Sequence, residues 1–142
     1  MGYLLDTGFL IRTEIIIPEA DVLLMDGNQP YTLINTNNNF YCLPIAIYVT
    51  VLNNTILYSG FNHLHCTNTN SHLPGALCAT IQENASPIGP TTYASLLVNF
   101  QASPNRFGGN NNYKPLEMFW DTLPTAGDGD LKVIVYYINE KR

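Results

Sequence analysis

The chain has 142 residues, which suits a single domain with room for a hydrophobic core. Charged residues make up 12% of the chain, about half the share found in typical soluble domains. Eleven acidic residues oppose six basic ones, and the formal net charge is −5 at pH 7. Because Lys and Arg dominate binding to a phosphate backbone, we expect no nucleic-acid partner.

The sequence also argues against a membrane segment. The longest strongly apolar stretch, Leu43–Leu52, contains Pro44 and Thr50 and is half as long as the roughly 20 residues that a spanning helix needs. The first residues, Met1–Asp6, lack the positive charge and the cleavage site of a secretory signal. We therefore expect no membrane partner and synthesis in a cytoplasm.

Short runs rich in Val, Ile, Tyr, Phe and Thr alternate with Gly, Pro and Asn clusters, which predicts an all-β chain. In chain order, the candidate strands are Phe9–Ile17, Asp21–Met25, Tyr31–Ile34, Phe40–Leu52, Thr55–Phe61, Leu77–Gln82, Thr92–Gln101, Leu116–Asp121 and Leu131–Ile138. The stretch Asn62–Pro90 is expected to be loops around one short strand. No segment carries a clear helical stripe, so any helix should be short.

These runs predict a single antiparallel β-sandwich domain, jelly-roll-like, with about eight to ten strands over residues 1–142. Residues 1–8 would form an extended N-terminal arm. Alternation within the strands predicts the core residues Leu43, Ile45, Ile47, Val49, Val51, Leu96, Val98, Phe119, Leu131, Val133 and Val135.

Two of the predicted strands, Phe40–Leu52 and Leu131–Ile138, are apolar on both faces. In a sandwich one face of each sheet meets the core, so apolar residues on the other face need a second partner. We expect this partner to be another copy of the chain. The alternatives are a loop of the same chain, or tyrosines tolerated at the surface. The predicted interface residues are Tyr48, Leu52, Tyr136 and Ile138.

The three cysteines cannot all pair within one chain, and a disulfide framework at this size would usually have four or more. We expect reduced, mostly buried thiols at Cys42, Cys66 and Cys78. These residues therefore predict no disulfide scaffold.

The residue types that bind transition metals cluster at His63, His65 and Cys66, with His72 and Cys78 downstream. On a strand, His63 and His65 would share one face and suit Zn²⁺ or Cu²⁺, with a third ligand from His72 or Cys78. The spacing matches no closed zinc motif. The favoured interpretation is ordinary strand or loop residues, with no metal bound.

Carboxylates gather in the segment Gly127–Asp130, with Asp121 nearby. Its carboxylates could hold Ca²⁺, but the later Glu of an EF-hand loop is missing. A tight turn leading into the last strand explains the glycines and aspartates without an ion. We therefore predict a turn.

No nucleophile elbow, phosphate-binding loop or dinucleotide fingerprint occurs in the chain. Asp121 and Glu117 could serve as the carboxylate pair of a glycosidase. Two carboxylates four residues apart on a strand are more often solvated surface groups. We predict no catalytic residues and no cofactor.

Three places carry a resemblance to a known family. They are Ile15–Met25 followed by Gln29–Ile34, then Tyr58 after Thr55–Leu57, and finally Leu123–Tyr137, a Gly-Asp turn with a long strand ending in Tyr. They resemble small β-sandwich virion proteins of tailed bacteriophages, which decorate capsids or form head fibres. The resemblance covers about a third of the chain and implies a trimeric virion component without catalytic residues.

We therefore expect a non-enzymatic structural protein of a bacteriophage virion, a capsid decoration (cement) or head-fibre subunit on the shell exterior. Its partners would be its own copies, the major capsid protein and other virion proteins. The alternatives are a tail or neck protein, or a module that binds a receptor or glycan on the host surface. A small hydrolase ranks last.

Overall fold

The computed structural model describes residues 10–35, 40–61, 63–67, 79–82, 94–97 and 115–141. Within these ranges the chain is all-β, with one short helix. The elements are β1 (Leu10–Ile17), α2 (Glu19–Val22), β2 (Tyr31–Ile34), β3 (Phe40–Leu52), β4 (His63–Thr67), β5 (Ala79–Gln82), β6 (Ala94–Leu97), β7 (Leu116–Trp120) and β8 (Asp130–Lys141). The predicted arm at residues 1–8 lies outside the described residues.

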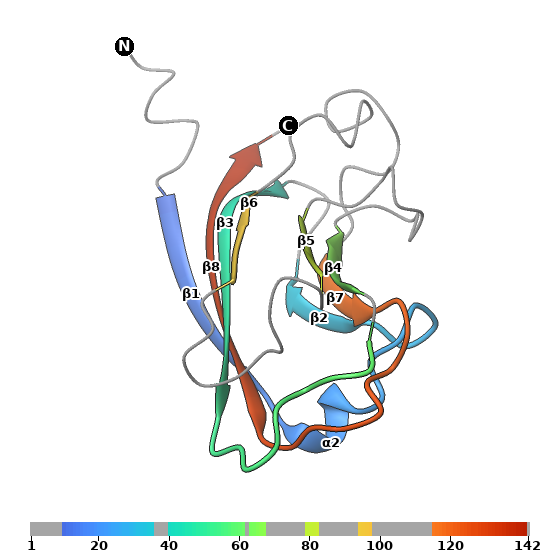
Figure 1. Ribbon diagram of the computed structural model, residues 1–142. Coiled ribbons are helices and arrows are strands. Elements are labelled where there is room, and N and C mark those ends of the chain that lie inside the picture. The colour runs from blue at the N-terminus through green and yellow to red at the C-terminus, as the bar shows by residue number, and fades with distance from the viewer. Residues whose placement is uncertain are drawn as a thin grey trace.

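The strands form two antiparallel sheets, with the orders β1-β8-β3-β6 and β2-β7-β4-β5. Figure 1 shows the long strands β1, β3 and β8 side by side as one curved sheet, with the shorter strands of the second sheet facing it. β8 pairs along its length with both neighbours, from Leu10 opposite Ile138 to Leu52 opposite Asp130. The first and last strands of the fold are therefore adjacent.

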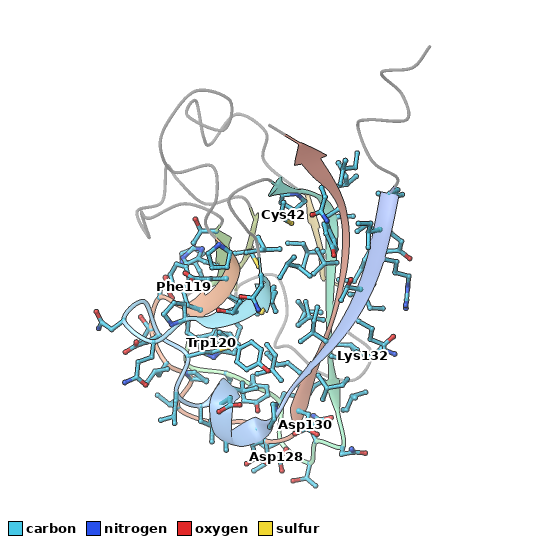
Figure 2. All side chains as sticks on the ribbon, turned by 180° about the vertical axis from the view of Figure 1, so that it is seen from behind. Cys42, Phe119, Trp120, Asp128, Asp130 and Lys132 are labelled. Carbon is cyan, nitrogen blue, oxygen red and sulfur yellow. The ribbon has the colours of Figure 1, made fainter. Side chains whose placement is uncertain are left out.

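One hydrophobic core joins the two sheets. The first sheet contributes alternate residues of β3 and β8, and the second contributes alternate residues of β4 and β7. The fully buried members include Ile47, Val49, Val51, Leu131, Val133 and Val135 on one side and Leu64, Cys66, Leu116, Met118 and Trp120 on the other. Figure 2 shows Trp120 between the sheets near α2. The buried thiols Cys42 and Cys66 also belong to this core, and Cys78 lies outside the described residues.

The core prediction is confirmed for six residues, Ile47, Val49, Val51, Leu131, Val133 and Val135. It is wrong for Ile45, which is 37% exposed. A bulge between Pro44 and Ala46 shifts the pairing of β3 with β8, so the buried positions change from even to odd numbers along the strand. Phe119 is buried but packs on the opposite face, against His65. The side chains of Leu43 and Leu96, and residue Val98, are outside the described part.

The predicted strand Asp21–Met25 is wrong, because the chain forms the end of helix α2 and then a turn there. The amides of Asp21 and Val22 both donate to the carbonyl of Pro18, and Pro is well suited to a helix start because it has no amide to satisfy. Val22 and Met25 are buried at a spacing of three residues, which matches a helical turn. No helix in the described ranges has the length and apolar character needed to cross a membrane.

Two further predictions fail between β3 and β5. The predicted strand at 55–61 is an irregular segment, held by an isolated bridge between Ser59 and Ala126. The strand expected at Leu77–Gln82 is present as the shorter β5, but the expectation of one strand within 62–90 is wrong, because the described residues there also include β4, which is hydrogen-bonded to β5. β4 was not predicted as a strand because His63 and His65 are polar. These two residues occupy the face of the sheet opposite its core residues.

Candidate functional site

Two strands bring His63, His65 and Asp121 together on one face of the second sheet. Successive side chains on a strand point to opposite faces, and Leu64 between the two histidines is buried in the core. Trp120, at the end of β7, pairs with Leu64 of β4. Asp121 follows directly, and its amide donates a 3.1 Å hydrogen bond to the carbonyl of His63.

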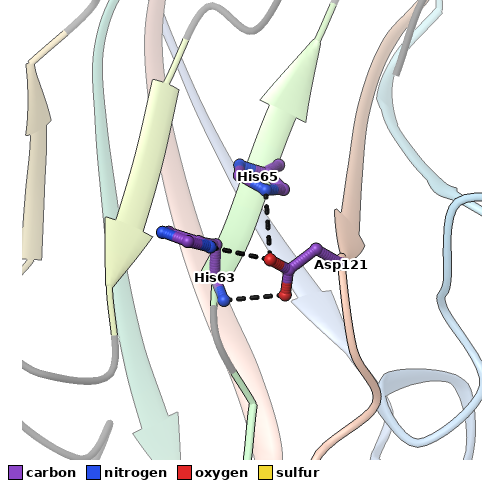
Figure 3. Close-up of side chains that lie close together, drawn as sticks. All are labelled: His63, His65 and Asp121. Carbon is purple, nitrogen blue, oxygen red and sulfur yellow. Dashed lines mark hydrogen bonds and ion pairs between the residues drawn. The ribbon is translucent and has the colours of Figure 1, made fainter. Parts of the chain in front are cut away.

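The Asp121 carboxylate uses both oxygens toward β4 (Figure 3). Its Oδ1 accepts a 2.8 Å hydrogen bond from the His63 amide, and its Oδ2 lies 2.7 Å from His63 Nδ1. The same Oδ2 is 3.8 Å from His65 Nε2. The two imidazole rings stack with centroids 5.2 Å apart and an interplanar angle of 16°. Three potential ligand atoms thus lie within 4.8 Å of one another.

Burial differs strongly across this cluster, which we call the His-Asp cluster. His65 is 7% exposed and packs against the Phe119 ring at 5.4 Å, whereas the side chains of His63 and Asp121 are about 30% exposed. Burial lowers the pKa of His65 to about 4, although the charge of Asp121 acts in the opposite direction. His65 is therefore neutral near pH 7.

Burial alone would raise the pKa of Asp121, but hydrogen bonds from the His63 side chain and amide outweigh it. The pKa of Asp121 consequently lies below its ordinary value. A neutral imidazole beside an ionised carboxylate is the protonation state in which both groups bind cations. The cluster is thus a partly open site with a negative charge at one corner.

The sequence indicated that His63 and His65 would share a face if they lay on a strand, and they do. The expected third partner was His72 or Cys78, and both lie outside the described residues. Cys66 faces the core. Asp121, which the sequence grouped with other carboxylates, is the residue that joins the histidines. Only the pairing of β4 with β7 reveals this contact, because 58 positions separate His63 from Asp121.

The segment Gly127–Asp130 forms the turn that leads into β8, with positive φ at both glycines. The Asp128 carboxylate accepts hydrogen bonds from the amides of Thr55 and Ile56, at 2.6 and 2.8 Å. These bonds lower the pKa of Asp128, that from Ile56 most. Asp130 instead accepts from the amide of Glu19 at 2.9 Å. The two carboxylates thus tie the turn to different segments, at the end of the molecule beside α2 in Figure 2.

Glu117 and Asp121 are placed far apart along the same extended segment. Glu117 lies within β7, and Asp121 follows the end of that strand. At about 3.3 Å per residue, four extended residues span about 13 Å, more than the roughly 5–9.5 Å between the carboxyl groups of glycosidases. The Asp121 carboxylate is instead engaged with His63.

The four predicted interface residues, Tyr48, Leu52, Tyr136 and Ile138, all lie on the outer face of the first sheet, opposite the core positions of β3 and β8. Tyr48 and Tyr136 form an edge-to-face pair with ring centroids 6.0 Å apart. Beside Tyr48 is an open hollow of about 380 Å³, lined in part by Thr50, Asn53 and Lys132. This outer face carries charged as well as apolar side chains, because Glu14 forms ion pairs with Arg12 and Lys132 on it.

Function has to be inferred from these contacts and from the strand order. No family model matches the chain, and comparison with curated proteins and with solved structures gives no match.

Proposed function

We propose that this chain is a jelly-roll subunit of a bacteriophage particle, attached to the outside of the head as a decoration or head-fibre protein. The observation that carries the proposal is the strand order. The pairs β1·β8, β2·β7, β3·β6 and β4·β5 all occur, as they do when one long hairpin folds over on itself. The first and third pairs share one sheet, and the other two pairs share the second. An eight-stranded jelly roll is expected to pair its strands in this order, and because that fold is common in viral capsid domains the order supports the proposal.

The surface supports the same proposal. Leu10 and Ile16 of β1 and Tyr48 of β3 are exposed on the outer face of the first sheet. Each Å² of apolar surface buried in an assembly contributes about 25 cal/mol before the entropy of association is subtracted. A virion subunit would bury this face against its own copies in a trimer, or against the major capsid protein. Binding to the assembled shell would stabilise that shell by mass action.

The test uses the intact particle together with the purified protein. A map of the particle with the subunit placed on the head exterior is the expected result, and particles lacking the protein should assemble but lose DNA more readily on heating. A map that places the subunit at the neck or tail would contradict the head location. If particles made without the protein had the same composition and heat stability as wild-type particles, the virion role would be overturned.

Self-association is tested separately by sedimentation at micromolar concentration. The double variant with Tyr48→Glu and Tyr136→Glu should shift the expected trimer toward monomer, because two buried charges would face the partner copy. The control is Leu24→Glu, which adds one such charge at an exposed position beside α2. If the wild-type protein were a monomer at micromolar concentration, the expected trimer would be overturned. The head location would then be tested by the map alone.

A second candidate, a module that recognises a host glycan, is favoured by the hollow beside Tyr48. An aromatic ring with amide, hydroxyl and ammonium groups suits a sugar, because the ring supplies contact area and the polar groups supply hydrogen bonds. Inhibition of phage adsorption by the purified protein, abolished by Asn53→Ala with Lys132→Ala, would support this candidate. Adsorption unaffected by excess protein would exclude it.

A further inference from the structure

We propose that His63, His65 and Asp121 form a binding site for a divalent transition-metal ion of the zinc type. Two imidazole nitrogens and one carboxylate oxygen are a donor set that Zn²⁺ uses in proteins. The same set leaves one position of a tetrahedral ion for water or a further ligand. The site lies on the outer face of the second sheet and is independent of the virion proposal.

Two of the donor–donor distances lie on either side of the value for such an ion, and all three donor atoms lie within 4.8 Å of one another. Zinc binds nitrogen and oxygen at about 2.0–2.2 Å, so neighbouring ligand atoms of a tetrahedral site lie about 3.3–3.5 Å apart. Here the Asp121 Oδ2 atom is 2.7 Å from His63 Nδ1 and 3.8 Å from His65 Nε2. One distance must open and the other must close by about half an ångström, which small side-chain rotations can provide. The ion would replace the hydrogen shared by His63 Nδ1 and Asp121 Oδ2.

The surrounding structure already holds the ligands in place. Asp121 Oδ1 is fixed by the His63 amide at 2.8 Å, which leaves Oδ2 to face the two imidazoles. The backbone bond from Asp121 to His63 continues the β4·β7 pairing at this point. The His65 ring is packed against Phe119. Such supporting contacts reduce the cost of organising the ligands and raise metal affinity.

The competing explanation is a hydrogen bond between His63 and Asp121 that serves the fold alone. That role needs only these two residues. A metal site needs His65 as well, although its imidazole is 3.8 Å from the carboxylate and beyond hydrogen-bond distance. His65 therefore separates the two explanations.

The experiment titrates the chelator-treated, full-length protein with Zn²⁺ and, in parallel, with Co²⁺. We expect one ion per chain by calorimetry, a tetrahedral Co²⁺ absorption spectrum without a thiolate charge-transfer band, and a melting temperature that rises with Zn²⁺ concentration. His65→Gln should weaken Zn²⁺ binding at least about tenfold. The control Asp21→Asn removes an exposed carboxylate of α2 and should keep wild-type affinity.

Wild-type protein that binds neither ion, or His65→Gln with wild-type affinity, would overturn the proposal. A thiolate band in the Co²⁺ spectrum would also overturn it, because it would place the ion at a cysteine. Asp121→Asn replaces the Oδ2 atom that faces His63 Nδ1 and so changes the fold and the site together, whereas the wild-type protein provides an independent test. On Zn²⁺ addition the imidazole NMR signals of His63 and His65 should shift together, and unchanged signals would contradict the site.

Discussion

The hydroxyl of Tyr58 donates a 2.6 Å hydrogen bond to the carbonyl of Gly129. This bond joins the irregular segment after β3 to the turn that precedes β8. The Tyr58 ring is fully buried and packs against Trp120, with ring centroids 5.9 Å apart. Burial, reinforced by the nearby carboxylates of Glu19, Asp128 and Asp130, raises the pKa of Tyr58 to about 12.

Tyr58→Phe should lower the free energy of unfolding by about 1–3 kcal/mol, because the ring is retained while the Gly129 carbonyl loses its buried donor. Urea denaturation at pH 7 measures this loss. Wild-type stability should also fall as the pH rises from about 10 toward 12, since only the unfolded state readily releases the phenolic proton there. The variant should lack this part of the alkaline decline, and an unchanged decline would contradict the assignment to Tyr58.

Gly127→Ala should destabilise the protein by at least about 2 kcal/mol. Gly127 has a φ of +136°, and an added Cβ would lie 2.7 Å from the Tyr58 Cα. The matched control is Gly27→Ala, whose Cβ would meet only the Phe119 ring, at 3.9 Å, and should change stability by no more than about 0.5 kcal/mol. Thermal melting of both variants checks the difference, and equal melting temperatures would contradict it.

Ile47→Ala and Ile45→Ala test the bulge in β3. Ile47 is fully buried, so its truncation should cost about 2–5 kcal/mol. Ile45 is 37% exposed, so the same truncation should cost less than about 1 kcal/mol. Chemical denaturation of the two variants compares them directly. A comparably large loss at Ile45 would mean that the strand keeps one unbroken alternation.

In the presence of a chelator, the free energy of unfolding should fall as the pH falls from about 6.5 to about 4. Unfolded His65 gains a proton near pH 6.5, whereas burial keeps the folded pKa at about 4. The unfolded state therefore binds more protons in this window, which destabilises the fold by up to about 3 kcal/mol. The lowered pKa of Asp121 adds to the loss at lower pH. His65→Gln should flatten the profile above pH 4, and a profile identical to wild type would exclude His65 as its source.

The long strands could be predicted because β3 and β8 are long runs rich in β-branched and aromatic side chains. The expected alternation of core positions failed where the pairing register shifts. The bulge at Pro44/Ala46 inserts one residue, and Pro44 is its signal in the sequence, because a proline within a strand is confined to edges and bulges. The helix α2 has four residues, which is too short to display a helical stripe.

The His-Asp cluster could be predicted only in part. Sequence spacing placed His63 and His65 on a common face, because that relation is local to one strand. The contribution of Asp121 depends on which strand lies beside β4 and in what register. Pairing of this kind is set by the whole fold, so residues 58 positions apart give no local signal.

The position of β8 between β1 and β3 also determines when this protein can fold. β1 is synthesised early, yet its hydrogen-bonding partner is β8, more than a hundred residues later. Until β8 leaves the ribosome, β1 and the β8-facing edge of β3 keep unpaired amides and carbonyls. Such long-range pairing slows folding and exposes nascent chains to aggregation. Completion of the first sheet therefore has to wait until β8 is available to pair with β1 and β3.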